Sequence, residues 1–214
     1  MLVKTYGAAV FGIDATTITI EVNIANGVNY FLVGLPDSAV KESQQRIKAA
    51  LCNNGYRFPG KEITINMAPA DIRKEGSLFD LSIAIGILAA SDQITANNLK
   101  DYLLLGELSL DGELKPLKGI LPIAIRAKLD GFKGLIVPSM NAREAAMVEG
   151  VQVLPATHLK CVINHLKGTK EILPLDIDIK KEFEQDNQQK DKKSNSIYEM
   201  PIIRTKEKRE RDFN

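Results

Sequence analysis

The segment from Phe79 to Ala90 places the strongest constraint on how this chain can fold. Its large apolar side chains fall on two sides of a helix, with Leu81, Ile85 and Leu88 on one side and Ile83 and Ile87 on the other. A helix that is apolar almost all round is buried on every side. The run is also far shorter than the ~20 residues needed to cross a bilayer. We therefore expect this helix at the centre of a soluble core, with no membrane span.

Segments with strand character lie on both sides of this helix. These segments are recognised by the alternation of apolar residues and by their content of β-branched residues. They are Val3–Phe11, Thr16–Ile24, Tyr30–Val33, Ile63–Met67, Tyr102–Leu105, Glu107–Leu110 and Glu113–Leu117. Asn26-Gly27 predicts a tight turn, so the first three strands are expected to be antiparallel neighbours. Asp111-Gly112 predicts a two-residue hairpin between the last two strands.

The first helix is expected to begin at Pro36-Asp37-Ser38, where Asp37 or Ser38 can cap free N–H groups. Its apolar residues keep helical spacing up to the stop at Gly55, namely Val40, Ile47, Ala50 and Leu51.

Beyond Ile120, helices and short strands alternate. The expected elements are a helix at Leu121–Leu129, a strand at Leu135–Val137, a helix at Ala142–Glu149, a strand at Val151–Leu154 and a helix at Leu159–Leu166. Such alternation predicts a partly parallel sheet. The expected fold class is α/β (α+β), with helices packed on a mixed sheet.

The composition of the 214-residue chain changes near residue 175. Residues 1–175 are enough for one domain with its own core. Residues 176–214 are rich in polar and charged side chains and poor in apolar ones, so we expect a disordered linker or tail there. A short docking element at Ile197–Ile203 is the alternative, and it would suit a stand-alone interaction protein.

Three blocks of sequence carry a resemblance to a known family. They are Gly34–Ser43, Met67–Leu81 (with Lys74-Glu-Gly-Ser-Leu-Phe-Asp80) and Gly106–Leu117 (with Gly106-Glu-Leu-Ser-Leu-Asp-Gly112). In this order they resemble the N-terminal domain of the ComM/YifB family, the competence-associated, magnesium-chelatase-like AAA+ ATPases of bacteria. The resemblance runs from about Leu2 to Pro174. It implies the Lon-protease-domain fold, shared with a small-subunit ribosomal protein and the RadA recombination factor, and containing a left-handed βαβ crossover.

The resemblance also implies a function and a setting. In the family, an Asp-Phe-x-x-Val-Lys-Gly-Gln segment leads into an AAA+ module, and Asp212-Phe213-Asn214 resembles its start. ATP and magnesium would then belong to that module, with no cofactor in this chain. The family points to a cytoplasmic hexamer that engages DNA during branch migration and natural transformation. This chain alone is expected to be no enzyme and to act in assembly and in DNA or substrate engagement.

The protease positions of the Lon fold are the first candidate site. Lon-type enzymes use a serine nucleophile activated by a nearby lysine. Aligning the two motif blocks places Leu78 at the serine position and Leu121 at the lysine position. We therefore expect no catalytic residue. The alternative is a weak Ser–Lys peptidase that uses the shifted pair Ser77 and Lys118.

Gly55–Glu62 reproduces the G-x-x-x-x-G-K pattern of a phosphate-binding loop but ends in Glu62 instead of Ser or Thr. The pattern also follows a helix and precedes a strand, which is the reverse of a phosphate loop. A helix-to-strand turn is the expected structure.

Basic residues are concentrated around the first helix and the loop that precedes the central helix. The candidates for nucleic-acid contacts are Lys41, Arg46, Lys48, Arg57, Lys61, Arg73 and Lys74, with Tyr56 and Phe58 able to stack on bases. Glu42, Glu62 and Glu75 lie among them, and the formal net charge is only +1. An ordinary solvated surface and a DNA-binding surface therefore both remain open.

The remaining polar positions are given structural roles. Asp71, Arg73 and Asp80 are expected to brace the Pro69–Gly76 loop, with Asp80 also accepting free N–H groups at the start of the central helix. The other motif positions expected to shape these blocks are Glu75, Gly76, Gly106, Glu107, Asp111 and Gly112.

Metal binding is not expected. His158 and His165 lie two helical turns apart without an obvious third ligand, and structural or surface roles fit them better. Cys52 and Cys161 lack metal-ligand or C-x-x-C spacing and fit a reducing cytosol.

Overall fold

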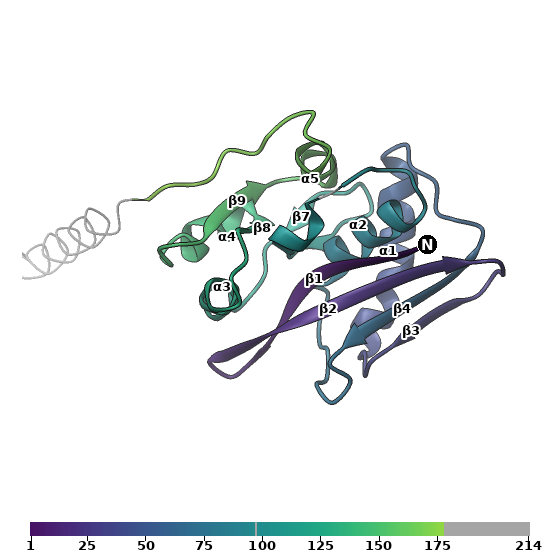
Figure 1. The fold of residues 1–214 in the computed structure, drawn as a ribbon, viewed down its shortest axis with the longest axis horizontal. Coiled ribbons are helices and arrows are strands. Elements are labelled where there is room, and N and C mark those ends of the chain that lie inside the picture. Colours follow the sequence, from purple (N-terminus) through teal and green to yellow (C-terminus); the bar gives the residue numbers. More distant parts are fainter. Residues whose placement is uncertain (97, 178–214) are drawn as a thin grey trace, which may run out of the picture. The chain divides into compact units, whose positions relative to one another are not determined.

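Two long strands, β1 (Leu2–Phe11) and β2 (Asp14–Ala25), form the antiparallel hairpin that begins the fold (Figure 1). The computed structural model describes residues 1–96 and 98–177. Met1–Ile177 form one compact unit. The predicted docking element at Ile197–Ile203 and the motif at Asp212–Asn214 lie outside the described residues.

The four-stranded sheet has the order β1-β2-β4-β3, with β3 at Tyr30–Val33 and β4 at Glu62–Ala68. β4 runs antiparallel to β2 and parallel to β3. The predicted antiparallel pairing of the first two strands is confirmed, but the third strand is not a neighbour of the second, because β4 lies between β2 and β3. Ile63, Ile65 and Met67 of β4 are all fully buried, which favours a central position, whereas β3 is only partly covered. The turn at Asn26-Gly27 is a local signal and does not fix which strands pair.

The β3–α1–β4 segment is a parallel βαβ unit, with helix α1 at Ser38–Asn53. Asp37 is the N-cap residue, and its carboxylate accepts a hydrogen bond from the Val40 N–H at 2.8 Å. The predicted apolar positions of α1 are all buried, namely Val40, Ile47, Ala50 and Leu51. The left-handed sense of a crossover in this fold stays a prediction.

A second, three-stranded sheet follows the order β5-β8-β9, with all strands parallel. Its strands are β5 (Tyr102–Leu104), β8 (Gly134–Pro138) and β9 (Gln152–Ala156). The helices of this half are the 3₁₀ turn η1 (Leu99–Asp101), α3 (Ile120–Leu129), α4 (Ser139–Ala145) and α5 (Leu159–Leu166). The parallel sheet was predicted, although α4 begins and ends earlier in the chain than expected.

A short hairpin, β6 (Glu107–Leu108) and β7 (Leu114–Lys115), leads into α3. The predicted two-residue turn is wrong, because the loop runs from Ser109 to Glu113. Asp111 accepts a hydrogen bond from the Ser109 hydroxyl and one from the Glu113 N–H at 3.3 Å. These contacts stabilise a wider loop than an isolated Asp-Gly turn would form.

Helix α2 (Asp80–Ala90) is the centre of the larger core, as predicted, and every one of its residues is buried. It packs against β1, β2, α1 and β6 (Figure 1). Gly86 allows the close approach to β2, since a Cβ there would lie 2.7 Å from Cγ2 of Val22. The predicted mixed α/β fold with helices packed on sheets is confirmed. In the described ranges, no helix has both the length and the apolar character needed to span a bilayer.

Candidate functional site

The N-terminal end of α2 carries a buried ion pair. Arg46 on α1 donates to Asp80 from Nε at 2.8 Å and from Nη2 at 3.1 Å. The Leu108 N–H on β6 donates to the same carboxylate at 3.2 Å. The Asp80 side chain is 1% exposed and that of Arg46 is 22% exposed. The pair therefore joins α1, α2 and β6 at one point.

This arrangement corrects two predictions. Asp80 does not brace the Pro69–Gly76 loop with Asp71 and Arg73, because its partners are Arg46 and Leu108. It also forms no capping hydrogen bond to its own helix, whose N-cap position is Phe79. A carboxylate at the start of a helix can face either the free N–H groups or a neighbouring element, and here the guanidinium of Arg46 is the stronger partner.

The electrostatics around Asp80 are set by burial. Burial raises the pKa of Asp80 to about 6, although Arg46 and the Leu108 N–H favour its charged form and partly offset the rise. Burial also raises the pKa of Tyr30 above its usual range, with the Asp80 charge adding to the effect. The hydroxyls of Tyr30 and Ser43 are buried and have no hydrogen-bond partner among the described residues.

The Pro69–Gly76 loop is held by residues other than those predicted. The Lys74 ammonium donates to the Pro69 carbonyl, and its side chain is fully buried. The backbone of Lys74 pairs with Leu35 and Asp37, and the second carboxylate oxygen of Asp37 accepts from the Gly76 N–H at 3.1 Å. Burial lowers the pKa of Lys74. Arg73 instead pairs with Glu75 at 3.2 Å on the surface, and Asp71 is exposed.

The protease positions show no serine–lysine pair. The fold has two hydrophobic clusters, the larger one around α2 and a second one formed by residues such as Leu103, Ile123 and Leu135 of β5, α3 and β8. Leu78 packs against both clusters, and the Leu121 N–H donates to Glu144 at 3.2 Å. The hydroxyl of Ser77 donates to Glu107, while Lys118 is exposed on the surface. The partner of the Ser77 hydroxyl is therefore a carboxylate. It is not the desolvated lysine that would activate a serine nucleophile.

The second motif block shapes the hairpin beside this site. Gly106 has no room for a side chain, since a Cβ there would lie 2.1 Å from Cδ2 of Leu114. Gly112 has a φ of +97° and lies against the amide of Asn54, which donates to the Asp111 carbonyl at 2.7 Å. These contacts attach the Asp111-Gly112 loop to the end of α1.

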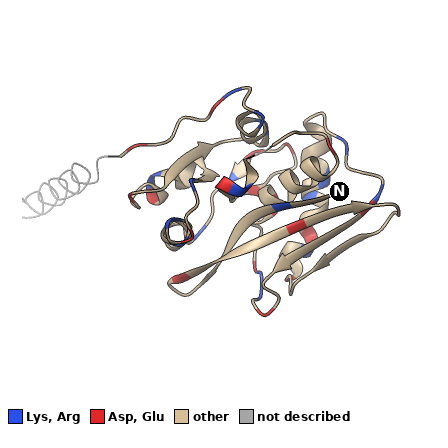
Figure 2. Ribbon diagram, in the orientation of Figure 1, with Lys and Arg blue, Asp and Glu red and all other residues tan. Residues whose placement is uncertain are grey.

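The predicted nucleic-acid residues fall into two groups. Arg46 and Lys74 are used inside the fold, so Lys74 in particular cannot contact a phosphate in this conformation. The other five are exposed, namely Lys41, Lys48, Arg57, Lys61 and Arg73. Figure 2 shows acidic and basic positions mixed over strands, helices and loops rather than gathered on one basic face.

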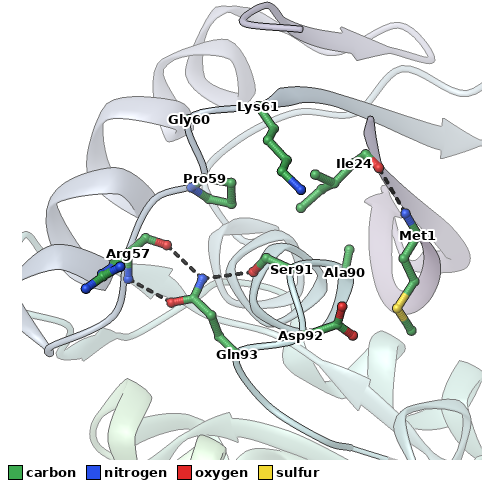
Figure 3. Close-up of a pocket in the computed structure, with 10 residues that line it drawn as sticks. All are labelled: Met1, Ile24, Arg57, Pro59, Gly60, Lys61, Ala90, Ser91, Asp92 and Gln93. Atoms are coloured by element: carbon green, nitrogen blue, oxygen red, sulfur yellow. Dashed lines mark hydrogen bonds between the residues drawn. The ribbon is translucent and has the colours of Figure 1, made fainter. Parts of the chain in front are cut away.

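Arg57 and Lys61 line a pocket of about 330 Å³ between the end of α2 and the loop before β4 (Figure 3). The Lys61 side chain points into this pocket, which Asp92 and Ser91 also border. Gln93 fixes the loop by accepting from the Arg57 N–H at 2.8 Å and donating to the Arg57 carbonyl at 2.8 Å. The pocket therefore combines charges of both signs.

Gly55–Glu62 connects α1 to β4 as a turn, as predicted from its context. Gly55 has a φ of +84°, and the Tyr56 N–H donates to the Leu51 carbonyl at 3.0 Å, which closes the helix end. No helix begins there, so this stretch lacks the helix N-terminus with which a phosphate loop binds its ligand.

Both histidines accept backbone hydrogen bonds. Nδ1 of His158, the N-cap residue of α5, accepts from the Lys160 N–H at 3.1 Å. Nδ1 of His165 accepts from the Ile172 N–H at 3.1 Å. Among residues 1–96 and 98–177, no group of three or more His, Cys, Asp or Glu side chains could hold a metal ion.

The comparisons with known proteins identify the family. The family described as subunit ChlI of Mg-chelatase matches residues 20–141. The competence protein ComM of Haemophilus influenzae is 46% identical over 182 residues, covering 85% of this chain and 35% of ComM. YifB of Escherichia coli is 45% identical over 161 residues, covering 75% of this chain and 32% of YifB. The chain thus spans about a third of the length of these relatives.

A weaker similarity extends to a protease. Lon protease 2 of Bacillus subtilis is 28% identical over 148 residues, covering 68% of this chain and 26% of the protease. This similarity agrees with the Lon-protease-domain-like fold that the motif blocks predict. The stronger matches show that the chain belongs to the ChlI-like magnesium-chelatase family that includes ComM and YifB.

Proposed function

We propose that this domain is the non-catalytic N-terminal part of a ComM/YifB-type AAA+ motor in the cytoplasm and that it engages DNA. The proposal rests on the exposed basic residues from α1 to the start of β4. The 46% identity with a competence protein supports it. Lys41, Lys48, Arg57 and Lys61 can each reach a phosphate without breaking an ion pair that the fold needs.

The positions that align with the Lon protease centre support a binding role over catalysis. Leu78 is part of the packing between the two hydrophobic clusters, and Ser77 is engaged with Glu107. ATP and magnesium would be bound by an AAA+ module that follows in the family, and hexamer formation would place several copies of the basic segment around one DNA. The role would be branch migration during natural transformation.

Binding of a forked DNA to the chain, measured by fluorescence anisotropy over a salt series, tests the proposal. The Arg57→Glu/Lys61→Glu variant is expected to weaken binding on every DNA sequence and to lower the salt slope by about 2. Lys100→Glu/Lys167→Glu is the matched control, since both lysines are exposed and lie on other elements. Equal weakening by the two variants, or no salt-dependent binding at all, would reject a direct DNA contact by this segment.

A further inference from the structure

Strand β3 forms an open edge of the four-stranded sheet (Figure 1). In the part of the chain that the structure describes, its partner is β4 alone. The Ile63 N–H of β4 donates to the Asn29 carbonyl at 2.8 Å. Backbone groups of alternate residues in a parallel ladder point to the same side, so those of Tyr30 and Leu32 point away from β4. These N–H and C=O groups can form hydrogen bonds with the backbone of another strand.

The edge lacks the features that usually prevent pairing with other chains. Edge strands are normally protected by charged side chains, proline or bulges. β3 reads Tyr-Phe-Leu-Val, with Phe31 47% exposed and Val33 46% exposed on the outer face of the sheet. Their neighbours on β4 are the polar residues Thr64 and Asn66. An apolar strip therefore lies along an unpaired backbone.

A pocket lies on the other side of the same edge. It measures about 350 Å³ and is lined by β3 and by two polar residues of α1, namely Tyr30, Phe31, Leu32, Lys41 and Gln44. Side chains alternate between the faces of a strand. A strand added beside β3 would direct one set of side chains into this pocket, toward Lys41, and the other set next to Phe31 and Val33.

From these features we propose that β3 and the pocket beneath α1 bind an extended segment of a partner protein in which apolar and acidic residues alternate. The backbone groups of Tyr30 and Leu32 provide the strand pairing, Phe31 and Val33 contact the apolar residues, and Lys41 meets a carboxylate. This protein-binding surface shares Lys41 with the basic segment proposed to contact DNA, but its pocket has no lining residue in common with the pocket of Arg57 and Lys61.

Charge favours such a partner over a second copy of this chain. Lys41 and Lys48 lie seven positions apart, two turns along one face of α1. Antiparallel pairing of β3 with β3 of a second copy would place the two α1 helices side by side on the same face of the joined sheet. The lysines of both helices would then face each other, which is unfavourable, whereas an acidic residue of the partner segment, placed in the pocket, neutralises Lys41.

The test uses the full 214-residue chain and a short fluorescein-labelled peptide of alternating valine and glutamate, followed by anisotropy. A valine–lysine peptide of the same length and an N-methylated valine–glutamate peptide are the ligand controls. We expect the unmodified valine–glutamate peptide to bind and both controls to bind at least about tenfold more weakly, because the first lacks the carboxylates and the second lacks backbone donors.

Lys41→Glu should weaken binding of the valine–glutamate peptide by about three- to tenfold and improve that of the valine–lysine peptide. Lys48→Glu is the matched control, because at about 10 Å along the helix its charge is screened at physiological salt. No binding of the valine–glutamate peptide, equal effects of the two variants, or full binding of the N-methylated peptide would overturn the proposal. A dimer in sedimentation velocity that Phe31→Lys dissociates would instead assign the edge to a second copy.

Discussion

Arg46 and Asp80 form a two-point ion pair between α1 and α2, with Nε–Oδ2 and Nη2–Oδ1 distances of 2.8 and 3.1 Å. The carboxylate is almost completely buried, whereas the guanidinium keeps some contact with solvent. The two members of the pair therefore differ in what their removal leaves behind. Loss of Arg46 leaves a carboxylate in the core, and loss of Asp80 leaves a cation that water can reach.

Arg46→Ala is therefore expected to destabilise the fold more than Asp80→Ala. Removing one partner of a buried pair typically costs about 3–5 kcal/mol, and Asp80→Ala should fall at or below the lower end of that range. Urea denaturation of both variants at neutral pH measures the difference. The exposed pair Arg73–Glu75 provides the control, since Arg73→Ala should change the free energy of unfolding by less than about 1 kcal/mol. A larger loss in Asp80→Ala than in Arg46→Ala would contradict this account.

The raised pKa of Asp80 predicts a dependence of stability on pH. The pKa is about 6 in the folded protein and near 4 in the unfolded chain, so between these values the folded state binds more protons. Stability then falls as pH rises through this window. Arg46, Glu107 and Tyr30 are the charged or titratable groups that act on Asp80 or respond to it.

The free energy of unfolding, measured from about pH 4 to about pH 7 and compared with Asp80→Asn, tests this dependence. Relative to that variant, the unmodified chain should lose about 1–3 kcal/mol as Asp80 ionises. In Arg46→Ala the loss should extend to higher pH, because the guanidinium no longer favours the charged carboxylate. Parallel curves for the unmodified chain and Asp80→Asn would show that Asp80 keeps an ordinary pKa.

Gly106→Ala should destabilise the protein by about 1–3 kcal/mol, because the added methyl group would overlap Leu114 on the facing strand. Gly60→Ala is the matched control. It has open space around the Cβ position, so its effect should be close to neutral or slightly stabilising. Thermal unfolding of the two variants side by side separates a packing conflict from a general effect of replacing glycine. Equal midpoints would mean that the hairpin moves freely enough to accept the methyl group.

Local patterns in the sequence were enough to predict α2, α1 and the later strands and helices. The periodicity of Phe79–Ala90 is a property of neighbouring residues, and the structure buries that helix on all sides. Strand order depends on which faces become buried after the chain crosses over, so the position of β4 between β2 and β3 could not be read from the turn at Asn26-Gly27.

The candidate site was harder to predict because its contacts join distant segments. Arg46 and Asp80 are separated by 34 positions, and nothing in the sequence near Arg46 distinguishes a partner of a buried carboxylate from a surface cation. Lys74 has the same ambiguity, since lysine is rarely buried and its Pro69 contact depends on the path of the loop. Asp37 was predicted as a helix cap, but its second bond, to Gly76, has no local signal.

Asp37 is expected to stabilise two segments through its two carboxylate oxygens. One accepts from the Val40 N–H in the first turn of α1, and the other accepts from the Gly76 N–H in the motif loop. Asp37→Ala should therefore lower the free energy of unfolding by more than the about 1–2 kcal/mol typical of a lost helix cap, and it should also increase hydrogen exchange in the loop around Gly76.

Asp37→Asn is the informative partner variant, because an amide oxygen can still cap Val40 but the amide nitrogen cannot accept from Gly76. Increased exchange at Gly76 in Asp37→Asn, with protection of α1 retained, would show that the two bonds act separately. Unchanged exchange at Gly76 in both variants would mean that Lys74 and its backbone contacts hold the loop without Asp37.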